Sequence, residues 1–220
     1  AAQADDGMEA FEVQPGFRVE LVAAEPLLRD PIAMAFDEHG RLFVVEYPEY
    51  NQDVAAGEEG PRGRVRMLED IDGDGRFDES TIYVSELDSP SAGACYHGGV
   101  FVAAAADLLF CKDTDGDGRA DQRKVVLTGF VRLANRTDPS LNSILWGLDN
   151  RFHACTSYSG SDIRSVVDKD SAPRSIRNRG FLFDPRTLQF DLSSGGGQHG
   201  LAIDDWGREF LCSNSSPVRM

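Results

Sequence analysis

Two copies of one acidic pattern supply side chains that could bind a metal ion. The pattern, D-x-D-G-D-G-R-x-D, occupies residues 70–78 and recurs 43 residues later at 113–121. Carboxylates at alternate positions, with a glycine that permits a sharp turn, suit calcium, which takes about six to eight oxygen ligands. The arginine of each copy would contribute its backbone carbonyl. The expected ligands are Asp70, Asp72, Asp74, Arg76 and Asp78 in the first copy, and Asp113, Asp115, Asp117, Arg119 and Asp121 in the second.

The residues around these loops do not fit an EF-hand. An EF-hand loop ends in a bidentate glutamate at position twelve, but Thr81 and Lys124 stand there in this chain. The flanking stretches 65–68 and 81–84 are β-rich rather than helical. We therefore expect calcium loops that close β-hairpins; the alternative is a pair of acidic, solvated turns.

Composition limits the kinds of partner. The 220 residues carry a formal net charge of −15, which argues against nucleic acid as a partner. No apolar run approaches the roughly 18 residues of a membrane helix, so any membrane association would come from regions outside this chain. The opening Ala-Ala-Gln-Ala resembles the end of a secretory signal peptide, and we expect an extracytoplasmic location, either periplasmic or associated with the cell envelope.

Four cysteines are widely spaced and form no CxxC motif: Cys95, Cys111, Cys155 and Cys212. Each lies in an apolar, strand-like segment, so the simplest interpretation is a small buried side chain. An extracytoplasmic location would permit disulfides, but the spacing does not say which cysteines would pair.

An apolar strand, a turn bearing Asp or Gly, and a second apolar strand recur along the chain. The copies lie at 33–45, 93–102, 144–155 and 201–211, and the third is lengthened by residues 158–178. Strand units at a period of roughly 40–45 residues indicate a β-propeller; a β-sandwich is the alternative. We expect an all-β chain, with a polar segment at 1–15 and about three and a half blades of a six-bladed ring at 16–220. Residues 17–22 alternate and would form the outer strand of the last blade.

Several motifs together resemble the N-terminal region of the membrane-bound dehydrogenases also called PVC-type haem-binding CxxCH proteins. They are GFRVELVAAEP at 16–26, DPIA at 30–33, GRLFVVE at 40–46, both acidic loops, WGLDN at 146–150 and DDWG at 204–207. The resemblance implies a propeller related to glucose/sorbosone dehydrogenases, which use pyrroloquinoline quinone. Longer members carry a C-terminal cytochrome c. Because this chain has no CxxCH, haem c would belong to a part of the protein outside it.

The resemblance also directs attention to histidines and arginines. A quinone-dependent dehydrogenase needs a base for the substrate hydroxyl proton and cations for the carboxylates of the quinone. His97 and His199 each precede an apolar strand and are the expected bases, although turn or packing histidines are commoner. The expected cofactor contacts are Arg174, Arg177, Arg179 and Gln198, although solvated arginines are the commoner case.

Two functions follow for the chain. The first is the propeller of an extracytoplasmic oxidoreductase that acts on a sugar or alcohol and passes electrons to cytochrome c. The second is a non-catalytic, calcium-stabilised propeller that binds carbohydrate or a protein partner. Many members of the resembling family have a histidine shortly before WGLDN, whereas residues 135–142 contain none, and this difference favours the second.

Overall fold

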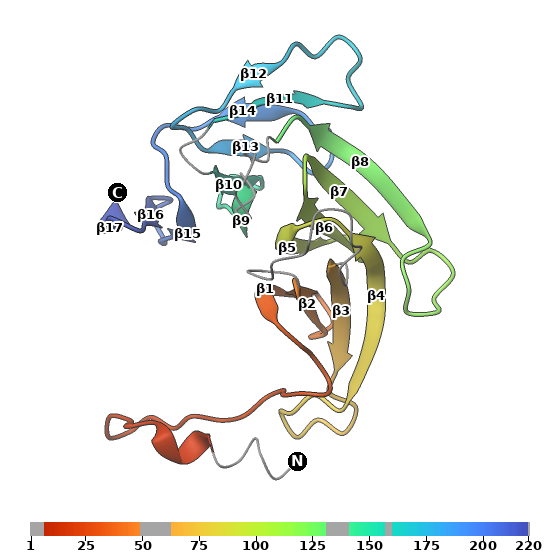
Figure 1. The fold of residues 1–220 in the computed structure, drawn as a ribbon, viewed down its shortest axis with the longest axis vertical. Helices are drawn as coiled ribbons and strands as arrows, with labels where there is room; N and C mark the ends of the chain where they lie inside the picture. The colour runs from red at the N-terminus through yellow and green to blue at the C-terminus, as the bar shows by residue number, and fades with distance from the viewer. Residues whose placement is uncertain (1–6, 49–62, 131–140, 157–159, 220) are drawn as a thin grey trace, which may run out of the picture.

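The computed structural model describes residues 7–48, 63–130, 141–156 and 160–219, and in these residues the chain is almost entirely β (Figure 1). The one helical element described is a single 3-10 turn, η1 (Met8–Ala10). Successive side chains of a strand point to opposite faces of a sheet; burial accordingly alternates along residues 90–96, whereas residues 42–46 and 99–104 are buried on both faces. The expectation of an all-β chain is confirmed.

Four antiparallel sheets follow one another along the chain. Blade 1 contains β1 (Pro31–Phe36), β2 (Leu42–Glu46), β3 (Gly63–Glu69) and β4 (Glu79–Leu87). Blade 2 contains β5 (Pro90–Tyr96), β6 (Gly99–Ala104), β7 (Asp107–Lys112) and β8 (Gln122–Thr128). Blade 3 contains β9 (Leu141–Trp146), β10 (Phe152–Thr156), β13 (Phe181–Phe183) and β14 (Phe190–Leu192). A fourth sheet contains β15 (His199–Ile203), β16 (Glu209–Ser213) and β17 (Ser216–Arg219).

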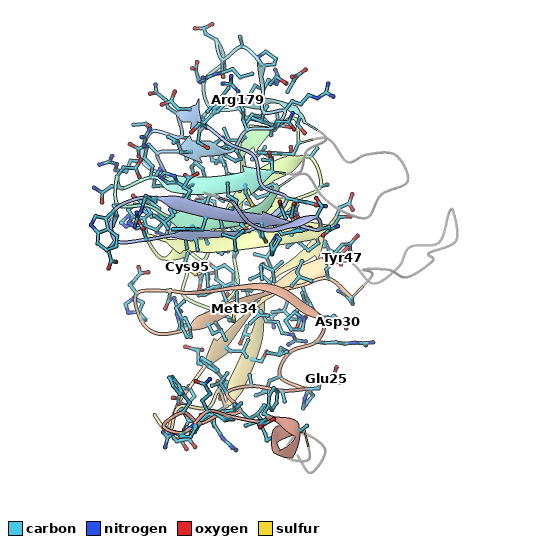
Figure 2. All side chains as sticks on the ribbon, turned by 90° about the vertical axis from the view of Figure 1, so that its left-hand side faces the viewer. Glu25, Asp30, Met34, Tyr47, Cys95 and Arg179 are labelled. Atoms are coloured by element: carbon cyan, nitrogen blue, oxygen red, sulfur yellow. The ribbon has the colours of Figure 1, made fainter. Side chains whose placement is uncertain are left out.

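The sheets are arranged in an arc around a common axis. The first strands of the four sheets, β1, β5, β9 and β15, lie side by side on the inside of the arc, and β4 and β8 lie on its outside (Figure 1). Figure 2 looks from the open side of the arc, where Met34 of β1 and Cys95 of β5 lie on neighbouring inner strands. This arrangement is that of a β-propeller.

The core lies between successive blades. Phe43 and Val65 of blade 1 pack with Val100 of blade 2 in one buried cluster. Phe101 of blade 2 and Phe183 of blade 3 belong to a second, with ring centroids 5.1 Å apart. Burying one large apolar side chain contributes about 1.5–3 kcal/mol to the free energy of folding. These contacts therefore hold neighbouring blades against one another.

The segment between β10 and β13 departs from the regular pattern. It forms a hairpin, β11 (Asp162–Ser165) and β12 (Arg174–Ser175), that adds to the outer edge of blade 2 by pairing β11 with β8. Ile163 and Ile176 anchor it because both are fully buried. The extra length expected at 158–178 is therefore structured within its described part, as a connection from blade 3 across blade 2.

The strand expected at 17–22 is not formed. These residues are extended but belong to no strand, and Phe17 is exposed. Their alternation is typical of a strand, but a strand also needs a hydrogen-bonding edge beside it, and no described strand pairs with them. Instead, the carbonyl of Val22 accepts a hydrogen bond from the backbone amide of Phe77, in the first acidic loop, at 2.9 Å.

Up-and-down topology gives the propeller two distinct faces. We call the end at which β1, β5, β9 and β15 begin the start face, and the end at which they turn into the following strands the turn face. Both acidic loops join the third and fourth strands of their blades, so both lie at the turn face.

Candidate functional site

The two acidic loops are wound by the same backbone hydrogen bonds. In each, the first aspartate accepts hydrogen bonds from the amides of both glycines: Asp70 from Gly73 at 2.7 Å and Gly75 at 2.9 Å, and Asp113 from Gly116 at 2.7 Å and Gly118 at 2.8 Å. All four glycines have positive φ, between 76° and 91°, a conformation that favours glycine. The repeated sequence therefore produces a repeated, tightly wound loop.

Carboxylate oxygens converge in each loop. Oxygens of Asp70, Asp72 and Asp78 lie within 4.8 Å of one another, as do those of Asp113, Asp115 and Asp117. Hydrogen bonds, led by that from the amide of Gly116, lower the pKa of Asp113, so this carboxylate stays ionised. A cluster of ionised, acceptor-only oxygens is what a hard cation requires; the residues present fit calcium.

The second loop is docked onto the preceding blade. The amide of Ala120 donates to the carbonyl of Tyr83 at 2.8 Å, and the amide of Asp113 donates to the Tyr83 hydroxyl at 3.0 Å. Tyr83 lies on β4 of blade 1 and is buried. The loop therefore joins blade 2 to blade 1 as well as closing its own hairpin.

His199 and Gln198 lie at the start face, where β15 begins. The side-chain amide of Asn142, on neighbouring β9, donates to the carbonyl of Gln198 at 2.7 Å. This bond fixes the approach to β15 next to the inner strand of blade 3. Asn142 was not singled out in the sequence, because an asparagine near a strand start carries no distinctive pattern.

His97 lies at the other end of the propeller. It occupies the tight turn between β5 and β6, with a positive φ of 49°, and is exposed. The two histidines expected as bases are therefore on opposite faces and cannot serve one site together. The sequence placed each before a strand, but it did not show that one strand is innermost and the other is second in its blade.

The arginines expected to contact the cofactor also lie in two different places. Arg174 contacts the outer strand of blade 3, where Nη1 donates to the carbonyl of Phe190 at 3.1 Å and the guanidinium lies 5.4 Å from that ring. Arg177 and Arg179 are exposed on the return to β13, at the start face. The amide of Gly180 donates to the carbonyl of Gly195 at 2.8 Å, which brings this return segment beside the approach to His199.

A third histidine, His153 on β10, joins two blades at the turn face. Its Nδ1 lies 2.5 Å from Oε1 of Glu209 on β16, and its Nε2 lies 2.9 Å from Oδ1 of Asp149. The hydrogen bond to Glu209, followed by that to Asp149, raises the pKa of His153. In the sequence, His153 is one residue of an alternating strand and carries no signal of its own. Its partners Asp149, in WGLDN, and Glu209, just after DDWG, lie far apart in the chain.

One protein family matches nearly the whole chain. A family described only as a domain of unknown function, DUF7133, matches residues 3–220. The chain belongs to this family. No curated protein matches it. The family's description assigns no activity, and the resemblance to haem-binding dehydrogenases remains a prediction.

A solved structure supports the propeller fold. The PQQ domain of pyranose dehydrogenase from Coprinopsis cinerea superposes with a TM-score of 0.62 at 16% identity, covering 92% of this chain and 48% of that one. A Trichoderma reesei enzyme of carbohydrate-active family AA12 gives 0.47 at 12%, covering 89% and 64%. The chain thus spans about half the length of the first structure. No described helix is long and apolar enough to cross a membrane.

Proposed function

We propose that this chain is the propeller part of an extracytoplasmic oxidoreductase that acts on a small sugar or alcohol with pyrroloquinoline quinone. The observation that carries the proposal is the start-face group of Asn142, Gln198 and His199, at the beginning of two adjoining inner strands. The superposition on a PQQ domain supports the choice of cofactor.

The residues at the start face fit such a cofactor. Arg177 and Arg179 are exposed there and could pair with carboxylates. The Gln198 side-chain oxygen accepts from the amide of Asn214 at 3.4 Å, and its NH2 group would be a donor for the cofactor. A bound quinone would supply the hydride acceptor.

His199 has the role of base in this proposal. It is half-buried at the start face, where β15 begins, and its imidazole would take the proton of the substrate hydroxyl. Asn142 holds the Gln198 carbonyl and so fixes the segment that carries His199. Cytochrome c, with its haem, would receive the electrons outside this chain.

Calcium in both acidic loops is the second part of the proposal. The converging carboxylates support it, and because the second loop is docked on Tyr83, calcium bound there would help to hold two blades together. The loops lie at the turn face, away from His199, so calcium would stabilise the site's framework rather than touch substrate.

The two histidines provide a matched test. Full-length protein loaded with calcium and pyrroloquinoline quinone is assayed by dye reduction over a panel of sugars and alcohols. Replacing His199 with alanine should lower the rate by about 10²–10⁴-fold, whereas His97→Ala, on the other face, should leave it unchanged. The reverse result would assign the base to His97 and reject the start-face site.

A binding propeller without catalysis is the second candidate. The absence of a histidine from residues 135–142 favours it. Of these residues, 135–140 lie outside the described part of the chain. If a calcium-loaded, folded protein binds no quinone and turns over no substrate in the same assay, this candidate replaces the oxidoreductase.

A further inference from the structure

A pocket opens at the turn face between blades 2 and 3, apart from the start-face group and from both carboxylate clusters. Its volume is about 530 Å³, within the range of roughly 300–1,000 Å³ typical of small-molecule sites. Its walls include Tyr96, Phe101 and Phe110 from blade 2, and Leu188 from the β13–β14 turn of blade 3.

Unequal strand lengths create this pocket. In blade 2, β8 runs for seven residues, whereas β13 and β14 of blade 3 have three each. Alternate residues of β8 face one side of the sheet, so Gln122, Lys124 and Val126 line the same wall. Val126 is buried in the interblade core, while Lys124 and Gln122 lie beyond the end of the blade 3 hairpin and are exposed.

The charge of the pocket is opposite to that of the protein. In a chain of net charge −15, the lining contains Lys124, Arg186 and His97 but no carboxylate. Arg186 is paired with Asp184, at 2.7 Å, whereas no ion pair joins Lys124 to any described residue. The free ammonium at the rim therefore favours an anionic ligand.

The walls favour a flat, apolar body. Tyr96 is stacked on Trp146, with ring centroids 5.9 Å apart, and Phe101 lies 4.8 Å from Phe110 by the same measure. A saccharide would bring many hydroxyl donors to a pocket with no carboxylate to accept them, and burying unpaired hydroxyls is costly. An aromatic ring would instead pack against the aromatic side chains.

We propose that this pocket binds a small planar aromatic carboxylate, with its ring between Tyr96 and Phe110 and its carboxylate on Lys124. The site is independent of the oxidoreductase proposed above. Lys124 stands three residues after Asp121, so the residue that departs from the EF-hand pattern has a use in binding.

Calorimetric titration of the calcium-loaded full-length protein tests the proposal. The probes are 4-hydroxycinnamate, its uncharged methyl ester and D-glucose. We expect one molecule of 4-hydroxycinnamate to bind per protein. The ester should bind at least about tenfold more weakly, because a charge-assisted bond is lost. Glucose should not displace the acid. Binding should also change the fluorescence of Trp146, which stacks on Tyr96, and this change should be lost in a Trp146→Phe variant.

Substitutions at lysine locate the carboxylate. Lys124→Gln should weaken binding about tenfold and Lys124→Arg should preserve most of it. Lys169→Gln, at an exposed lysine outside the pocket, is the control and should have no effect. Equal affinity of the Lys124→Gln variant, equal affinity for acid and ester, or displacement by glucose would each overturn the proposal.

Discussion

Val22 and Tyr83 occupy equivalent positions relative to the two acidic loops. The eighth residue of each pattern donates its amide hydrogen to the preceding segment: Phe77 to the carbonyl of Val22 at 2.9 Å, and Ala120 to that of Tyr83 at 2.8 Å. Tyr83 belongs to the outer strand of blade 1. The segment around Val22 therefore lies beside blade 1 where the outer strand of a preceding blade would lie, although it is not itself a strand.

Chelation of calcium should loosen both of these contacts. With free calcium about 100 times above Kd, binding would stabilise the fold by about 2.7 kcal/mol, and excess chelator should lower the Tm accordingly. Asp72→Ala and Asp115→Ala should each remove part of the calcium effect, whereas Asp205→Ala, at an exposed position outside the loops, should not. Hydrogen exchange at the amides of Phe77 and Ala120 should become faster without calcium. A melting curve unaffected by chelator would contradict the role assigned to these loops.

Tyr83→Phe isolates the link between the second loop and blade 1. The hydroxyl of Tyr83 accepts from the amide of Asp113, and burial of this side chain raises the pKa of the phenol to about 12. Removing the oxygen leaves that amide without its acceptor, at a cost of about 1–3 kcal/mol. Urea denaturation should show the loss, and calcium titration should show weaker binding at this loop. Tyr47→Phe is unsuitable as a control because Tyr47 bonds to buried Ser89; Ile82→Val, at a more exposed position on β4, is suitable.

The sequence predicted local structure better than it predicted placement. Residues 33–36 and 42–45 were expected as strands around a turn and form β1 and β2 with Asp37 at the turn, because period-2 alternation and turn chemistry are local properties. The pairing of β11 with β8 was not predictable in this way. It joins residues of one blade to the edge of another, and the alternation of Asp162–Ser165 specifies a buried face but not a partner.

The candidate sites show the same limit. Each acidic loop is contained within nine residues, so the convergence of three of its carboxylates was predictable from spacing, while the binding of calcium there stays a prediction. The separation of His97 from His199 depends on which strands are innermost, and the meeting of His153 with Glu209 depends on the order of blades. Neither the separation of His97 from His199 nor the contact of His153 with Glu209 can be predicted from a short stretch of sequence.

His153 should make the stability of the contact between blade 3 and the fourth sheet depend on pH. Bonds to Glu209 and Asp149 raise the pKa of His153 above its usual 6.5. Burial works against ionisation of Asp149, but its bonds with His153 and Arg151 outweigh this and lower its pKa. The imidazolium thus contributes stability that is fully present below about pH 6.5 and is lost as the pH rises through the higher pKa of the folded state.

Melting curves between pH 5.5 and 8.5 test this dependence. The protein should lose Tm as the pH rises over this range, and His153→Gln should remove most of that slope while lowering stability at pH 5.5. His39→Gln changes an exposed histidine in the β1–β2 turn and should leave the slope unchanged. If the dependence of Tm on pH is unchanged in His153→Gln, then the hydrogen bonds of His153 to Glu209 and Asp149 are not its cause.

Glu46 should be the most sensitive single acidic position in blade 1. Its side chain is completely buried at the end of β2, where one carboxylate oxygen is bonded to Arg64 and the other lies 3.0 Å from Nε of Arg66 and accepts from the amide of Arg29 at 2.6 Å. Glu46→Ala leaves two largely buried guanidinium groups without their counter-ion, and breaking a buried pair in this way costs about 3–5 kcal/mol.

Glu46→Gln keeps the shape and one acceptor oxygen, so it should cost less than the alanine variant but still be destabilising, because the arginines lose the negative charge. Glu79→Ala, at an exposed position of β4, should change stability by no more than about 0.5 kcal/mol. Urea denaturation with calcium present measures all three variants against the same baseline. An effect of Glu46→Ala as small as that of Glu79→Ala would mean that the arginines find other partners, and that the strands β2 and β3 are held together by their backbone ladder and apolar packing alone.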